Sequence, residues 1–152
     1  MALERIDPFQ REDRFCVDHL LRYAWLQPLV DKQRVLDVAC GHGFGCAMLS
    51  EANASAVVGV DLDEATIGQC RERWKNPRVE FRTGRIEALA GMGMEPFDRV
   101  VCFETLEHLE SPETALEALR SVMSEGGLLV GSVPGEPDVM EENEFHLQFF
   151  NA

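Results

Sequence analysis

The chain has 152 residues, of which 45% are hydrophobic, and this size suits one domain with its own core. Its formal net charge of -13 and its sequence pI of about 4.6 disfavour a surface for nucleic acid or other phosphate-rich partners. The acids are concentrated toward the C-terminus: residues 1–86 carry 12 basic and 13 acidic side chains, whereas residues 87–152 carry 2 and 14. Such an acidic face usually keeps a protein in solution, although it can also hold a divalent metal ion.

The cysteines and the N-terminus bear on cellular location. The five cysteines are odd in number and none belongs to a CxxC pair, which predicts reduced thiols in a cytosolic protein. The N-terminus is charged from its fourth residue, and no stretch approaches the ~18 apolar residues that span a bilayer. We therefore expect a cytoplasmic protein that is not bound to a membrane.

Helical and strand-like segments alternate along most of the chain. A leading helix is expected over residues 14–26, because its apolar residues have helical spacing and the pattern breaks before Pro28. Beyond it, strands are expected at residues 34–39, 56–61, 78–82, 98–103 and 127–133, and helices at residues 45–52, 64–74 and 113–123. This alternation predicts βαβ units and the α/β class, a parallel sheet with helices on both faces.

The last expected helix has the clearest end signals. Ser111 can cap it, Pro112 suits its first turn, and Gly126 is expected to close it. The chain is expected to form one domain over residues 1–152, made of a leading helical region (1–30), a core (34–133) and a final segment (134–152) that loops over the carboxyl ends of the strands.

A glycine-rich turn follows the first expected strand. Residues 35–45 read VLDVACGHGFG, so an apolar run leads into three glycines and then into a helix whose first amides would face a ligand. A dinucleotide-binding turn would have its third glycine where this chain has Cys46. S-adenosylmethionine needs no phosphate contact there, and Asp37 would bind it through water or meet its amino group. The next apolar run, AVVGVDLD, ends in Asp61, whose carboxylate could accept both hydroxyls of a ribose.

Four motifs occur in the order found in class I S-adenosylmethionine-dependent methyltransferases: VLDVACGHGFG, GVDLD, FDRVVCFETLEHL and LRSVMSEGGLLVGSVP. The chain resembles that family over roughly residues 34–150. The resemblance implies a Rossmann-like sheet and cofactor contacts from Asp37, Ala39, Gly41, Gly43, Asp61, Leu62, Gly84, Arg85, Ile86 and Phe103. The family often has an acid directly after the glycine at position 84, for the adenine amino group. Because this chain has Arg85 there, that contact would pass to a backbone carbonyl or to Glu87.

The segment Glu104-Thr105-Leu106-Glu107-His108 follows the fourth expected strand. If it forms one helical turn, Glu104, Glu107 and His108 project from the same side and suit magnesium, manganese or zinc. The pattern is similar to that of O-methyltransferases of ubiquinone biosynthesis and small-RNA 2'-O-methyltransferases, which implies Glu104, Glu107, His108 and His146 as metal ligands. In that case the metal would lower the pKa of an acceptor hydroxyl that attacks the methyl group.

A second interpretation of the same segment needs no metal. Many metal-independent relatives also have LEH after the fourth strand, and in them the histidine acts as a base or packs under the cofactor. His108 would then be the general base and Glu107 would support it. The sequence leaves both interpretations open.

The end of the chain bears on assembly. Complete members of the family usually add two strands after the fifth, as an antiparallel hairpin at the sheet edge, and residues 134–152 leave no room for that hairpin. The chain is therefore expected to be a fragment or an abbreviated domain. Its exposed fifth strand would favour a homodimer through that edge.

We expect a methyltransferase that acts on an oxygen of a small-molecule acceptor. A phenol and a glycan sugar both remain open; the sugar is suggested by EDRFCVDHLLRYAW and the NEFH segment, which resemble methyltransferases of polysaccharide assembly. Nucleic acid is a less favoured partner because of the acidic balance. The alternatives are a non-catalytic S-adenosylmethionine-binding or interaction domain and, third, an oxidoreductase with a nicotinamide cofactor.

Overall fold

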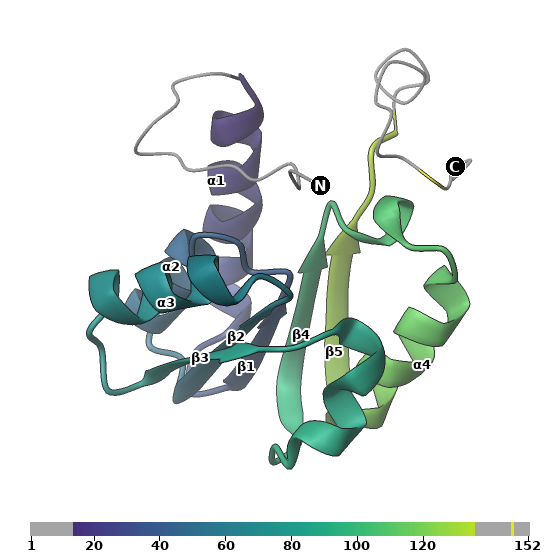
Figure 1. Ribbon diagram of the computed structural model, residues 1–152. Coiled ribbons are helices and arrows are strands. Elements are labelled where there is room, and N and C mark those ends of the chain that lie inside the picture. Colours follow the sequence, from purple (N-terminus) through teal and green to yellow (C-terminus); the bar gives the residue numbers. More distant parts are fainter. Residues whose placement is uncertain (1–13, 136–146, 148–152) are drawn as a thin grey trace.

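The fold is a five-stranded parallel sheet in the order β3-β2-β1-β4-β5 (Figure 1). The structure is a computed structural model that describes residues 14–135 and residue 147. The strands are β1 (Arg34–Val38), β2 (Ala56–Asp61), β3 (Val79–Thr83), β4 (Phe97–Phe103) and β5 (Met123–Ser132). Every neighbouring pair is parallel, as expected for strands joined by helical crossovers.

Helices cover both faces of this sheet (Figure 1). On one side lie α1 (Arg14–Leu26), α2 (Phe44–Glu51) and α3 (Glu64–Arg73), and on the other lie α4 (Pro112–Ser121) and the 3-10 helix η2 (Ile86–Met92). Two further 3-10 segments, η1 (Gln27–Leu29) and η3 (Leu106–His108), follow α1 and β4. The prediction of an α/β, Rossmann-like fold is confirmed.

Alternate side chains of the central strands divide between two apolar cores. In β1, Val35 packs in the core under α1, α2 and α3, whereas Leu36 packs in the core under α4 and η2. In β4, Val101 and Val100 divide in the same way. Because strands of a sheet covered on both sides are apolar at nearly every position, they stand out in the sequence as continuous runs.

The boundary between α4 and β5 differs from the prediction. The helix ends at Ser121 and the strand begins at Met123, so Gly126 lies inside β5 and does not close the helix. Gly126 has φ +75°, and the pairing with β4 is irregular beside it, since Phe97 faces Met123 and Arg99 already faces Leu128. The glycine therefore serves a bulge in the strand, where a left-handed residue is needed.

The cap of α4 also differs. Ser111 occupies the N-cap position, but its side chain makes no bond to the helix backbone. Its hydroxyl instead lies 2.9 Å from the hydroxyl of Thr114. The predicted position of the cap is correct, and the predicted capping bond is wrong.

The direction of the strand order reverses between β1 and β4. The chain runs outward from β1 through β2 to β3 and then returns to pair β4 with the other side of β1. Ligands of wound α/β sheets bind at such a reversal. Within the described residues β5 lies at the sheet edge, and a homodimer through it stays a prediction. No helix of residues 14–135 has the length and apolar character needed to cross a membrane.

Candidate functional site

Asp37 lies at the end of β1 and is almost completely buried. Its side chain shares the sheet face of Val35, toward α1 and α2. The Tyr23 hydroxyl donates to both carboxylate oxygens, at 3.0 and 3.1 Å, and the Cys46 thiol lies 3.3 Å from Oδ2. Burial raises the pKa of Asp37 to about 7, although the hydrogen bonds from Cys46 and Tyr23 act in the opposite direction.

This shift predicts a pH-dependent stability. Between about pH 4 and pH 7 the folded protein holds a proton on Asp37 more tightly than the unfolded chain does, so the free energy of unfolding falls as the pH rises through about 7. In Asp37→Asn this fall should be absent. At pH 8 the free energy of unfolding of the variant should therefore exceed that of the natural protein by up to about 4 kcal/mol, since one pKa unit corresponds to about 1.4 kcal/mol. Urea unfolding of both proteins at pH 5.5 and pH 8 measures it. Parallel pH dependences of the two proteins would contradict it.

The turn after β1 brings its backbone close to buried rings. Gly43 has φ +73°, and a Cβ there would lie 2.7 Å from the Phe81 ring and 3.0 Å from Trp74. A Cβ at Gly45 would overlap the ring of Tyr23. These two glycines are thus needed for close approach of the chain, a requirement that holds whether or not a ligand is bound.

Ala39 is in the left-handed region at φ +57°, where an alanine is strained. The motif that puts Ala39 among the predicted cofactor contacts carries no signal of this conformation. Ala39→Gly should raise the free energy of unfolding by about 1 kcal/mol, because glycine relieves the strain at the cost of some chain entropy. Chemical denaturation measures the change. A destabilised variant would show that Ala39 makes packing contacts that outweigh the strain.

Asp61 connects the end of β2 to the glycine turn. Its Oδ2 accepts from the backbone N–H of Gly41 at 3.0 Å, and its Oδ1 accepts from that of Asp63 at 3.0 Å. Each carboxylate oxygen has a second lone pair, so both can also accept a ribose hydroxyl. Next to it, the Leu62 side chain is 49% exposed and offers apolar area to a flat base.

The third predicted loop lies at the same end of the sheet. The backbone N–H of Gly84 donates to the carbonyl of Asp61 at 2.9 Å, which fixes this loop beside β2. Arg85 is exposed and pairs with Glu87 at 3.3 Å, whereas Ile86 is buried. The predicted cofactor residues of three loops are therefore brought together, and their individual contacts stay predictions.

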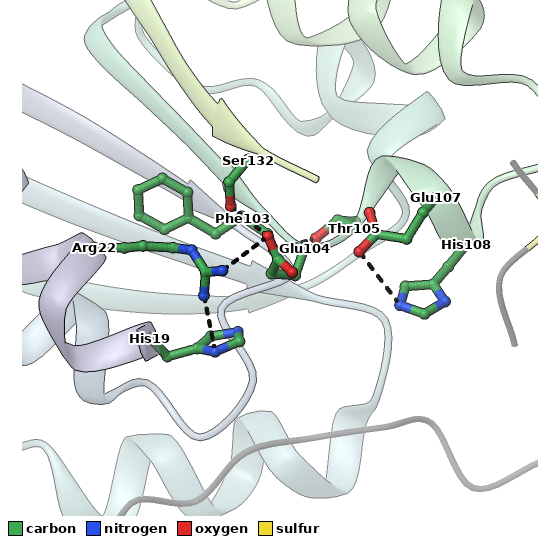
Figure 2. Close-up of polar contacts among 8 residues, drawn as sticks. All are labelled: His19, Arg22, Phe103, Glu104, Thr105, Glu107, His108 and Ser132. Atoms are coloured by element: carbon green, nitrogen blue, oxygen red, sulfur yellow. Dashed lines mark hydrogen bonds and ion pairs between the residues drawn. The ribbon is translucent and has the colours of Figure 1, made fainter. Parts of the chain in front are cut away.

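Glu104 lies just after β4 and points toward Arg22 and Ser132 (Figure 2). Ser132 donates to its Oε1 at 2.7 Å, and Nη2 of Arg22 lies 3.3 Å from the same oxygen. Nη1 of Arg22 lies 3.2 Å from Nδ1 of His19. Glu104 has φ +46° and only residues 106–108 are helical, so residues 104–108 do not form the single helical turn that would put Glu104, Glu107 and His108 on one side.

Glu107 and His108 form a separate pair on the other side of this loop (Figure 2). The Glu107 carboxylate is 1% exposed, and neither of its oxygens has a hydrogen-bond partner within the described part of the chain. Nε2 of His108 lies 3.9 Å from Oε1 of Glu107. Burial, helped by the nearby charge of Glu104, raises the pKa of Glu107 to about 7. The backbone carbonyl of Glu107 accepts from the N–H of Leu147 at 2.7 Å.

The predicted four-ligand metal site is not assembled by residues 14–135 and 147. Those residues contain no group of three or more His, Cys, Asp or Glu side chains that could hold an ion. Glu107 and His108 lie together, Glu104 is bound to Arg22 and Ser132, and His146 lies outside the described residues. The described side chains thus fit a metal poorly, and a metal-dependent step stays a prediction.

A groove of about 500 Å³ runs between α1 and the ends of β4 and β5. Its lining residues are Asp18, Leu21, Arg22, Trp25, Phe103, Val130, Gly131 and Ser132. None of the predicted site residues lies in α1, although that helix supplies half of this lining. A signal was present: Val17, Leu21 and Trp25 recur every four residues and form an exposed apolar stripe, separate from the buried face of α1.

A wound parallel sheet with acids at the tips of β1 and β2 and a glycine turn between them defines a protein that binds a nucleoside-type cofactor. The methyltransferase domain family matches residues 35–127, and the chain belongs to the class I S-adenosylmethionine-dependent methyltransferases. This membership favours S-adenosylmethionine over the nicotinamide cofactor of the third hypothesis.

The relatives and solved structures agree with this family. A ubiquinone biosynthesis O-methyltransferase of Pseudomonas putida is 37% identical over 114 residues, which cover 70% of this chain and 47% of the relative. This chain therefore spans about half the length of the curated relatives that it matches. A putative S-adenosylmethionine-dependent methyltransferase of Listeria monocytogenes shares the fold with TM-score 0.69 at 22% identity, covering 78% of this chain and 55% of that one. The N-methyltransferase NodS of Bradyrhizobium japonicum, in complex with S-adenosyl-L-homocysteine, shares the fold with a TM-score of 0.69 at 21% identity. The match covers 79% of this chain and 62% of NodS.

Proposed function

We propose that this protein transfers the methyl group of S-adenosylmethionine to an oxygen atom of a small-molecule acceptor. The observation that carries the proposal is the pair of buried carboxylates at the ends of β1 and β2, Asp37 and Asp61, of which Asp61 accepts from the N–H of Gly41 in the glycine turn. Asp61 would accept the ribose hydroxyls, and Asp37 would face the amino group of the methionine part. S-adenosylmethionine supplies a positively charged sulfonium, which leaves as a neutral thioether after transfer.

For the acceptor we propose a phenol in preference to a sugar. The groove beside Glu104 is walled by Leu21, Trp25, Phe103 and Val130, side chains that suit a flat apolar ring better than a ring of hydroxyls. The name of the relatives, which are ubiquinone biosynthesis O-methyltransferases, supports transfer to oxygen.

For the chemical step we propose His108 as the general base, which requires that the acceptor hydroxyl reach from the groove around the loop of Glu104 to the imidazole. A neutral imidazole would take the proton of the acceptor hydroxyl as its oxygen attacks the methyl carbon, in line with the departing sulfur. The proton would end on the ring, and the carboxylate of Glu107, 3.9 Å from Nε2, would stabilise the resulting imidazolium. No covalent enzyme intermediate is needed. Glu104 would keep its contacts with Arg22 and Ser132 throughout.

Two measurements test this function. Titration calorimetry with S-adenosylhomocysteine asks whether the cofactor site exists, and mass spectrometry of a panel of catechols, simple phenols and monosaccharides asks which acceptor gains a methyl group. We expect binding, transfer to a phenol, and a loss of about 100-fold or more in kcat for His108→Gln with unchanged cofactor affinity. Glu117→Gln, on the solvent-exposed side of α4, is the matched control.

Each negative result has its own meaning. Binding without transfer to any member of the panel would favour the non-catalytic S-adenosylmethionine-binding alternative. Absence of binding at millimolar ligand would refute the proposal itself. Calorimetry with manganese alone tests the metal hypothesis, and saturable binding that is lost in Glu107→Gln would restore it.

A further inference from the structure

The helix α1 precedes the region shared with the methyltransferase family, yet it delivers a side chain to the cofactor site. Tyr23 is 5% exposed, and its hydroxyl donates to both oxygens of Asp37. Its ring meets Phe44 and Phe103 edge-on, with centroids 5.4 and 5.2 Å apart, and fills the space above Gly45. The hydroxyl is thus aimed by a ring that is fixed on three sides.

We propose that Tyr23 is a positioning residue for the cofactor: its hydroxyl keeps the Asp37 carboxylate ionised and correctly oriented for the cationic methionine part of S-adenosylmethionine. This inference rests on the proposed binding of that cofactor at the ends of β1 and β2. It assigns a specific role to a residue outside the shared family region.

The surroundings of Asp37 explain why a donor is needed there. The titratable groups on the same side of the sheet as the carboxylate are Tyr23 from α1, Cys46 from α2, Cys40 from the turn after β1 and Asp61 from β2, while Cys102 of β4 lies in the core on the opposite face. None of these side chains is a cation, and Asp61 is a like charge. Burial therefore favours the protonated acid, and hydrogen-bond donors are what stabilises the ionised form within the described residues.

Tyr23→Phe keeps the ring and removes only the hydroxyl. Without that donor the pKa of Asp37 should rise further above 7, so that fewer molecules hold the carboxylate at neutral pH. For a rise of about one unit, the affinity for S-adenosylmethionine should fall about fivefold at pH 7 and hardly change at pH 9. Titration calorimetry at both pH values measures this, and ionisation of the ligand cancels because both proteins bind the same compound.

Two further variants separate positioning from general damage to the helix. Val17→Ala alters the exposed stripe of α1 without approaching Asp37 and should leave affinity unchanged at both pH values. In an Asp37→Asn background, Tyr23→Phe should cause no pH-dependent change. An equal loss at pH 7 and pH 9, or no loss at all, would overturn the inference. If the natural protein itself does not bind S-adenosylmethionine, the proposed function fails first.

A spectroscopic test does not depend on the folding of any Tyr23 variant. The chain contains a single tyrosine, so 3-fluorotyrosine labels Tyr23 alone. The fluorine resonance should titrate with a midpoint near pH 7 as Asp37 ionises, and saturating S-adenosylmethionine should move that midpoint downward. A resonance that is independent of pH between 5 and 9 would show that the hydroxyl does not sense Asp37, and the inference would be wrong.

Discussion

Asp61→Asn is expected to weaken S-adenosylmethionine binding by at least about 100-fold. A carboxylate that accepts two ribose hydroxyls makes two charge-assisted hydrogen bonds, each contributing about 1.5–3 kcal/mol. The amide that replaces it has one acceptor oxygen, and that oxygen can satisfy only one of the two backbone donors, Gly41 and Asp63, that Asp61 now serves. Titration calorimetry at pH 7.5 measures the loss, and thermal shift with S-adenosylhomocysteine gives an independent reading.

Asp63→Asn is the matched control for this prediction. Asp63 is the N-cap of α3, where its Oδ1 accepts from the N–H of Ala65 at 3.2 Å, and asparagine caps helices about as well. The control changes the same charge two residues away and should leave affinity within about threefold. A similar loss in both variants would mean that the local negative charge attracts the cofactor and that Asp61 makes no specific ribose contact.

Gly45→Ala should destabilise the protein by about 3 kcal/mol. Gly45 lies in α2, where alanine by itself would favour the helix, but the added Cβ would overlap the buried ring of Tyr23. That ring cannot move easily, because its hydroxyl is bonded to Asp37 and its edges meet two phenylalanine rings. Urea denaturation gives the change in the free energy of unfolding.

Gly68→Ala provides the opposite sign as a control. Gly68 lies in α3, and a Cβ there would meet no atom within 4 Å. The substitution should therefore raise the free energy of unfolding by about 1 kcal/mol through helix propensity alone. If Gly45→Ala proves equally stabilising, Tyr23 does not pack on α2 in the way described.

The strands could be predicted because both faces of this sheet are covered. The runs that became β1, β2 and β4 are apolar at nearly every position, and the predicted bounds differ from the structure by one residue at most. The end of α4 could not be predicted in this way. A glycine at this position usually ends a helix, but pairing with β4 already begins at Met123. Gly126 then adopts the left-handed conformation that the bulge in β5 requires.

The site was predictable where its residues follow one another along the chain. The glycine turn and the acids at positions 37 and 61 were placed by motif spacing, and the structure brings them to one end of the sheet. The contacts of Arg22 and Tyr23 depend on how α1 packs across the sheet. The residue spacing within α1 does not predict partners that lie 14 residues or more away along the chain. The left-handed conformation of Glu104 has no sequence signal either, because residues with left-handed backbone dihedrals are usually glycine or asparagine and not glutamate.

The packing of α1 sets where this domain begins. The family region starts at residue 35, but a shortened protein that starts there would lack Tyr23. It would therefore lose both the ring that packs against Gly45 and the hydroxyl that donates to Asp37. Glu104 would lose its guanidinium partner as well. The buried Asp37 and the partly buried Glu104 would then lose these partners, so we expect the smallest unit able to fold and to hold its cofactor to include the helix that runs from Arg14 to Leu26.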